Sequence, residues 1–198
     1  MSFLARLPYD TIFSTVYFGL RLNLCLAAAC SPLLLALAMS QDPLAAWPFF
    51  VALASLCAPA TAAGFATFTG SSFWAAYRRR FWRSMAVGGA ASTFAVVLGI
   101  EVTFAARTRF AVVVPMLLVL AALIPVVSAQ LLAANESRLL AAAYQCVRRW
   151  YLSLANLAVL LMVAAAVTVK PAVGLFLLPA PALYLVWANA RHMASTTG

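Results

Sequence analysis

Acidic residues and histidine are almost absent from this chain, which has four Asp and Glu residues and one His among its 198 residues. Acid–base catalysis and most metal sites need several such groups at close spacing. Asp10, Asp42, Glu101 and Glu136 match no catalytic or metal-binding motif, either with one another or with His192. We therefore expect a protein that is not an enzyme and that binds no metal and no cofactor.

Polar residues of every kind are also scarce. Charged residues make up 9% of the chain and hydrophobic residues 66%, and the mean hydropathy is +1.01. Soluble domains average about 45–50% apolar residues, so this chain has too few polar side chains to cover a surface that faces water. The predicted fold class is an all-α, polytopic membrane helical bundle that forms a single integral membrane domain over residues 1–198.

The four cysteines form no CxxC pair and have no neighbouring histidine. Zinc ribbons and thioredoxin-like redox motifs are therefore excluded. We interpret the cysteines as small apolar residues, not as disulfide or zinc ligands. They are Cys25, Cys30, Cys57 and Cys146.

Six apolar runs have the roughly 17–24 residues that cross a bilayer core of about 30 Å. They are 22–39, 48–70, 84–104, 110–133, 152–169 and 172–188. Ahead of the first run, residues 11–20 predict an interfacial helix that ends at Arg21, at headgroup level. Prolines interrupt four of the runs, as they do in transporters and also in membrane helices that have no transport role.

Residues 73–83 predict a short amphipathic helix between the second and third runs. On a helical wheel, four aromatic residues share about a third of the circumference: Phe73, Trp74, Tyr77 and Phe81. Arg79, Arg80 and Arg83 cluster on the other side, and Arg78 lies near the aromatic arc. Such a helix lies flat at a membrane surface, with rings toward the acyl chains and guanidinium groups toward phosphates. Lipid anchoring and partner docking both fit this pattern.

Residues 138–151 predict a second amphipathic segment, with Leu140, Tyr144, Val147 and Tyr151 on one face. It resembles the first segment, so the chain contains a possible parallel repeat of span, amphipathic helix and span over 48–104 and 110–169. The candidate contacts to a partner or to lipid are Phe73, Trp74, Tyr77, Arg78, Arg79, Arg80, Phe81, Trp82, Arg83, Arg148, Arg149 and Trp150.

The distribution of Lys and Arg predicts the orientation. With the N-terminus inside, ten of the thirteen basic residues are cytoplasmic, and only Arg107, Arg109 and Lys170 lie outside. This asymmetry favours both termini and both amphipathic segments on the cytoplasmic side. Because the arginines lie at the ends of apolar runs, we assign the net charge of +9 to the lipid bilayer and not to nucleic acid.

Three polar residues fall near or within the apolar runs. Arg21 and Asn23 suit headgroup contact and helix–helix hydrogen bonding, although either could bind a partner. Glu101 lies about one turn from the end of its run, where Arg107 or Arg109 could neutralise it; a role in transport or partner contact is the alternative.

Two strings in the first half of the chain resemble a known family. APATAAGFA at 58–66 resembles its PATAA-type motif, and FWAAYRRRFWRS at 73–84 resembles the FW-x-x-Y/F-(K/R)-x-x-F segment that follows it. Asn23-Leu24 is similar to the family's NL dipeptide. Together, over residues 21–90, they resemble the YesL-like membrane proteins, domain of unknown function 624.

The resemblance implies a bacterial cytoplasmic-membrane protein encoded beside carbohydrate ABC importers, and it carries over no catalytic or ligand residues. Our first functional hypothesis is therefore a non-catalytic accessory subunit that contacts the permease or ATPase of such an importer. The second hypothesis is a small oligomeric transporter or channel for a small solute, suggested by the proline-containing helices and Glu101.

Overall fold

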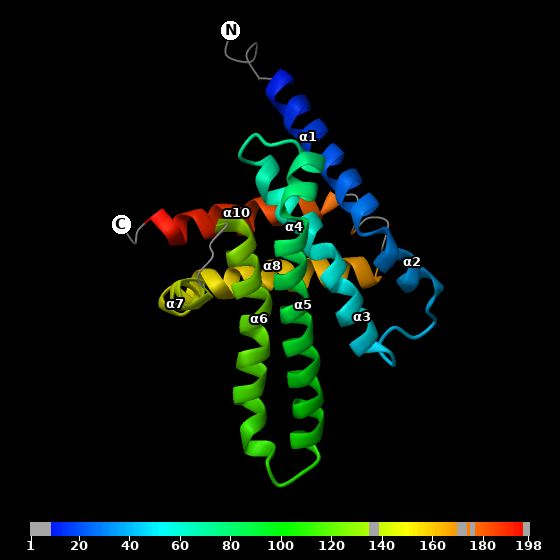
Figure 1. The fold of residues 1–198 in the computed structure, drawn as a ribbon, viewed down its shortest axis with the longest axis vertical. Helices are drawn as coiled ribbons and strands as arrows, with labels where there is room; N and C mark the ends of the chain where they lie inside the picture. The colour runs from blue at the N-terminus through cyan, green and yellow to red at the C-terminus, as the bar shows by residue number, and fades with distance from the viewer. Residues whose placement is uncertain (1–8, 135–138, 170–173, 175–176, 196–198) are drawn as a thin grey trace, which may run out of the picture.

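The computed structural model describes residues 9–134, 139–169, 174 and 177–195 (Figure 1). Every regular element in these ranges is helical, as predicted. The elements are α1 (Tyr9–Ala29), α2 (Ser31–Met39), α3 (Trp47–Ala54), η2 (Ser55–Cys57), α4 (Ala58–Thr67), α5 (Phe73–Ala106), η3 (Ala111–Val113), α6 (Val114–Ala134), α7 (Leu139–Arg148), α8 (Trp150–Val169) and α10 (Pro179–Ser195).

The first helix does not break at Arg21. Helix α1 runs through this residue to Ala29, and the chain bends by 68° at Cys30 before α2 begins. The bend lies ahead of Pro32, whose ring clashes with the carbonyl four residues earlier and whose nitrogen cannot donate a hydrogen bond. The prediction of a separate interfacial helix over 11–20 is therefore wrong.

Most of the prolines begin helices. Pro32, Pro48 and Pro59 lie in the first turns of α2, α3 and α4, where the missing N–H has no intrahelical partner to lose. Pro125 lies inside α6.

Helix α5 is the longest element and includes the segment expected to lie flat. It continues from Phe73 to Ala106 over 34 residues without a break. At about 1.5 Å per residue, it is about 50 Å long, or about 20 Å longer than the hydrocarbon core. Residues 73–83 are therefore the first three turns of a long rod, and the prediction of a separate surface helix is wrong for this segment.

Four described stretches are long and apolar enough to cross a membrane: Trp47–Thr67, Phe73–Ala106, Ala111–Ala133 and Trp150–Val167. The bent pair of Phe13–Ala29 and Ser31–Met39 would be a fifth. The sixth predicted run, 172–188, lies partly outside the described residues, and the α10 helix that follows Leu178 is not among these stretches. A membrane bundle with four to five spans is therefore supported, and the sixth span stays a prediction.

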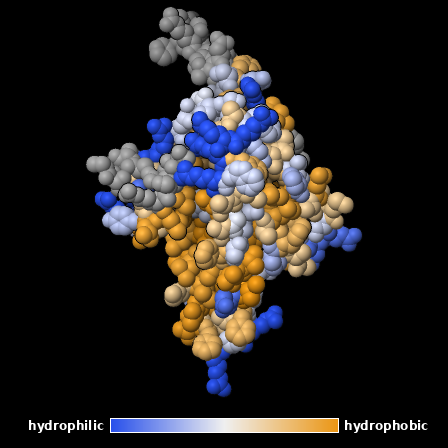
Figure 2. Space-filling model, in the orientation of Figure 1, coloured by the Kyte–Doolittle hydropathy of each residue, from blue (hydrophilic) through white to orange (hydrophobic). Residues whose placement is uncertain are grey.

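Helices α5 and α6 form an antiparallel hairpin that projects from the rest of the molecule (Figure 1). Helices α8 and α10 cross this hairpin instead of running alongside it. Apolar side chains cover the visible face of the hairpin, with hydrophilic groups above them and at the tip (Figure 2). We call the end where α5 begins and α7 ends the arginine-bearing end.

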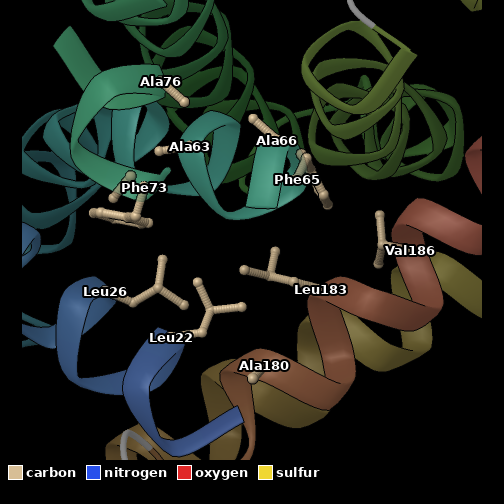
Figure 3. Close-up of a cluster of buried hydrophobic side chains, with 11 residues drawn as sticks. Leu22, Leu26, Ala63, Phe65, Ala66, Phe73, Ala76, Ala180, Leu183 and Val186 are labelled. Atoms are coloured by element: carbon tan, nitrogen blue, oxygen red, sulfur yellow. The ribbon is translucent and has the colours of Figure 1, made fainter. Parts of the chain in front are cut away.

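Helix α4 lies at the centre of the core. Eight of its ten residues are buried, all of them small except Pro59 and Phe65. Leu22 and Leu26 of α1 pack on it from one side and Leu183 of α10 from another (Figure 3). The small side chains let neighbouring helices approach α4 closely, so the APATAAGFA string is mainly a packing element.

Candidate functional site

The arginine-bearing end begins with the first turns of α5, whose inner face is buried. Phe73 is only 7% exposed and Ala76 is buried, while Tyr77 and Arg80 are half-buried. The expected lipid-facing position of Phe73 is therefore wrong. Its side chain packs inward because this part of α5 stands against the core instead of lying on the membrane.

The predicted aromatic arc does exist as a ladder along α5. Phe73 and Tyr77 stack with their ring centroids 6.2 Å apart, and the ring centroids of Tyr77 and Phe81 follow at 5.6 Å. Trp74 and Trp82 flank this ladder and are exposed, Trp82 to 81%. The exposed rings are available to lipid or to a partner, whereas the ladder stiffens the helix.

Three of the four arginines at the start of α5 lie on its outer side. Arg78, Arg79 and Arg83 are exposed. Arg80 is half-buried, and the charges of Arg79 and Arg83 are close enough to act unfavourably on it. Crowded guanidinium groups of this kind form a strong site for anions.

Helix α7 brings a second set of predicted contacts to the same end. Its apolar side, with Leu140, Tyr144 and Val147, faces outward, as expected for a helix in a membrane surface. Arg148 and Trp150 fall at the end of this helix and the start of α8, and Trp150 is exposed as well. Arg138 lies outside the described residues.

Arg149 ties the α7–α8 junction to α10. One of its guanidinium NH groups donates a hydrogen bond to the carbonyl oxygen of His192, at 3.2 Å. Next to His192 in α10, the guanidinium of Arg191 lies 4.9 Å from the ring centre of Trp187. The last turns of α10 therefore belong to the arginine-bearing end.

A buried amide network lies beneath this end, and the sequence did not reveal it. Gln130 of α6 is only 2% exposed. Its Nε2 donates to Gln145 Oε1 of α7, at 3.0 Å, and to the Ala190 carbonyl oxygen of α10, at 3.4 Å. Its Oε1 accepts no hydrogen bond from the described residues. In the sequence, only the presence of a glutamine near the end of the apolar run at 110–133 hinted at this network.

A second amide pair joins α8 and α10. Asn189 Nδ2 donates to Asn156 Oδ1 at 2.7 Å, and Asn156 is buried. Nearby, the Ser153 hydroxyl donates to the Cys146 carbonyl oxygen at 2.8 Å. These contacts hold α7, α8 and α10 together where apolar packing alone would not define one register.

Asn23 caps a distant helix. Its Oδ1 accepts a hydrogen bond from the backbone N–H of Ala180 in the first turn of α10, at 2.7 Å. Its side chain thus takes part in a helix–helix hydrogen bond, one of the roles expected for it. Arg21, two residues earlier, is exposed and lines a cavity of about 400 Å³ together with Ser71, Ser72 and the start of α5.

Glu101 lies far from this site, toward the tip of the hairpin. It is exposed, and within the described part of the chain it forms no salt bridge with Arg107 or Arg109, which are exposed as well. The expected neutralising pair is therefore absent from the structure.

The structure also brings two cysteines together. The thiols of Cys30, at the α1–α2 bend, and Cys57, at the end of η2, interact directly. Both remain free thiols. Nothing in their sequence spacing indicated this contact, because it depends on how the two broken helices fold against each other.

The described residues contain no group of three or more His, Cys, Asp or Glu side chains that could hold a metal ion. Comparison of the chain with known proteins finds no matching family model, no matching curated protein and no matching solved structure.

Proposed function

We propose that this protein is a non-catalytic accessory subunit of the bacterial cytoplasmic membrane that docks on the permease or ATPase of a carbohydrate ABC importer. The observation that carries the proposal is the exposed first half of α1. This part of the helix extends for three turns ahead of Arg21 and presents an exposed apolar face.

The exposed face of α1 is unusually apolar for a segment that precedes a headgroup-level arginine. Phe13 is 71% exposed and Tyr17 is 67% exposed, and Val16 and Leu20 continue the same face. Beside this face, Val16 and Leu20 line a groove of about 690 Å³ together with Phe68 and the start of α10. A stripe of this kind is a typical contact for a helix of a partner protein.

Charge favours a partner that approaches from the arginine-bearing end. The exposed arginines of α5 would steer an acidic partner surface toward the molecule. The choice of a carbohydrate importer comes from the resemblance of residues 58–66 and 73–84 to the YesL-like family.

We place both termini in the cytoplasm. The basic residues favour this orientation, and the contact between Arg149 and His192 supports it by holding the end of α10 beside the α7–α8 junction. This orientation requires an even number of crossings between the two termini.

Photo-crosslinking in living cells tests the proposal. A photo-reactive phenylalanine analogue in place of Tyr17 should form an adduct with the importer's permease or ATPase, and deletion of the protein should reduce sugar uptake. The matched control carries the analogue in place of Leu44, which is also highly exposed but lies in the loop between α2 and α3. Adducts with lipid alone, together with unchanged uptake, would refute the proposal.

The buried amides favour a second candidate function, a small oligomeric transporter. Polar residues inside a membrane bundle often line a solute path, and Gln130 Oε1 has an unused acceptor site among the described residues. Proteoliposomes of the purified protein would then show solute flux without any partner, and Gln130→Leu would abolish that flux. Flux that is equal in protein-free vesicles would eliminate this candidate.

A further inference from the structure

An apolar groove runs along the outside of the α5–α6 hairpin. It has a volume of about 600 Å³ and is lined by one side of α5, one side of α6 and two residues of α7. Apart from Arg83 at one end and Ser128, the lining side chains are apolar. The Ser128 hydroxyl donates to the Ile124 carbonyl oxygen of its own helix, so a molecule in the groove does not have to supply a hydrogen-bond acceptor for it.

Small residues on α5 produce the hollow. Ala86 and Ala90 leave space between the two helices, and the ring of Phe94 closes the lower end. Leu139 and Ala143 of α7 border the upper end. Arg83 and Phe94 are eleven residues apart, or about 16 Å along the helix. That length is close to half of a hydrocarbon core of about 30 Å, which is one leaflet.

The upper end of the groove is positively charged. Arg83 itself lines it, and Arg79 is one turn away on the same helix. Arginine binds phosphate through two parallel N–H donors, more specifically than lysine does. A hollow one leaflet deep, with an arginine at headgroup level, complements the shape and the negative charge of an anionic phospholipid.

We propose that the α5–α6 groove binds one acyl chain of an anionic phospholipid, whose phosphate pairs with Arg83. The site differs from general attraction of arginines to a charged surface, because it requires both the hollow and the guanidinium group. It also differs from the docking surface on α1, so either proposal can fail without the other.

Native mass spectrometry of the full-length protein in detergent tests the site, with phosphatidylglycerol and phosphatidylcholine as probes. The wild-type protein should retain one phosphatidylglycerol more tightly than phosphatidylcholine. Arg83→Gln should weaken phosphatidylglycerol about tenfold, which is typical of losing one charge-assisted hydrogen bond. Ala90→Leu should fill the hollow and weaken both lipids.

Two matched variants separate the groove from general effects. Arg78→Gln removes an exposed arginine of the same helix outside the groove, and Ala155→Leu adds the same volume to an exposed position on α8. Neither should change retention. Equal losses for Arg78→Gln and Arg83→Gln, or unchanged binding in Ala90→Leu with the helical content of the wild type, would overturn the proposal. If Ala90→Leu does not fold, Ala86→Leu replaces it under the same criterion.

Discussion

Gly88 determines how closely α5 approaches α4. A Cβ atom at this position would lie 2.5 Å from the Ala58 Cβ and 2.9 Å from the Ser55 carbonyl oxygen. Neither atom can move easily, because the Ala58 Cβ is bonded directly to the backbone and the Ser55 carbonyl oxygen is part of the backbone. A Cβ atom at the adjacent Gly89 would have no neighbouring atom within 4 Å, so the two glycines form a natural control pair.

Gly88→Ala should therefore reduce the free energy of unfolding by about 1–3 kcal/mol, the usual cost of overpacking. Gly89→Ala should leave it unchanged or raise it by roughly 0.5–1 kcal/mol, because alanine loses less backbone entropy in a helix. Denaturant unfolding in detergent measures both. Equal effects of the two variants would mean that α5 and α4 are not in close contact at Gly88.

The pair of Cys30 and Cys57 gives a second prediction. A thiol-oxidising reagent should join these two residues into an intramolecular disulfide that protects both from maleimide, because their thiols are already in contact. Cys25 should remain a free thiol. Burial raises the pKa of the Cys146 thiol, although a hydrogen bond with Ser153 acts in the opposite direction, so Cys146 should stay protonated and unreactive at neutral pH.

Mass spectrometry of the labelled protein distinguishes the four thiols. Cys57→Ser should restore labelling at Cys30, whereas Cys25→Ser should not. A disulfide that includes Cys25 would contradict the arrangement of the α1–α2 bend.

The sequence predicted how side chains are distributed around a helix better than it predicted what surrounds each side. The helical wheel correctly grouped Phe73, Tyr77 and Phe81, which form the ladder along α5. It could not show which side of the helix meets protein and which meets lipid. In a membrane chain both environments are apolar, so Phe73 gives the same signal in either. For the same reason, the partners of Gln130 and Asn23 depend on helices far away in the sequence.

The continuity of the long helix α5 could have been predicted from the lack of proline in this part of the sequence. No proline occurs between Pro59 and Pro115, so nothing in that interval prevents a continuous helix after the turn at Gly70, where φ is +85°. The change from an arginine-rich pattern to an apolar one at Ser84 marks a change of surroundings and not the end of an element. The break at Arg149 between α7 and α8 shows that the second amphipathic segment behaves differently, and the proposed repeat stays a prediction.

Spin-label distances test whether α5 is straight. Labels at positions 78 and 100 should be about 33 Å apart along a continuous helix. If residues 73–83 lay flat and α5 turned at a right angle at Ser84, the same labels would be about 26 Å apart. A control pair at 86 and 100 should give about 21 Å in both cases, so only the longer distance discriminates between them.

The helices of the bundle do not all run parallel to one another (Figure 1). Helix α10 is held at its start by Asn23 and near its finish by Arg149. It crosses the α5–α6 hairpin instead of following it (Figure 1). Hydropathy alone could not show this arrangement, because a helix that covers other helices can be as apolar as one that crosses the bilayer.

Sidedness follows from this arrangement and can be measured in a cysteine-free background with a membrane-impermeant maleimide. Arg78→Cys and His192→Cys should react from one side of the membrane. Leu44→Cys and Thr108→Cys should react from the other. Labelling of position 192 together with position 108 would mean that only one of α8 and α10 crosses the bilayer, and it would place the end of α10 opposite the arginines of α5.

The hydrogen bond between Asn23 and Ala180 also sets an order for biosynthesis. The two residues are 157 positions apart, and ribosomes add about 5–20 residues per second, so roughly 8–30 s separate their synthesis. During this interval the Asn23 Oδ1 cannot accept from the Ala180 N–H, and lipid headgroups or the insertion machinery can take the place of that donor. Completion of α10 is therefore a late assembly step, and a chain that ends before this helix would lack the Ala180 N–H from which the Asn23 Oδ1 accepts a hydrogen bond, a difference that membrane quality control could recognise.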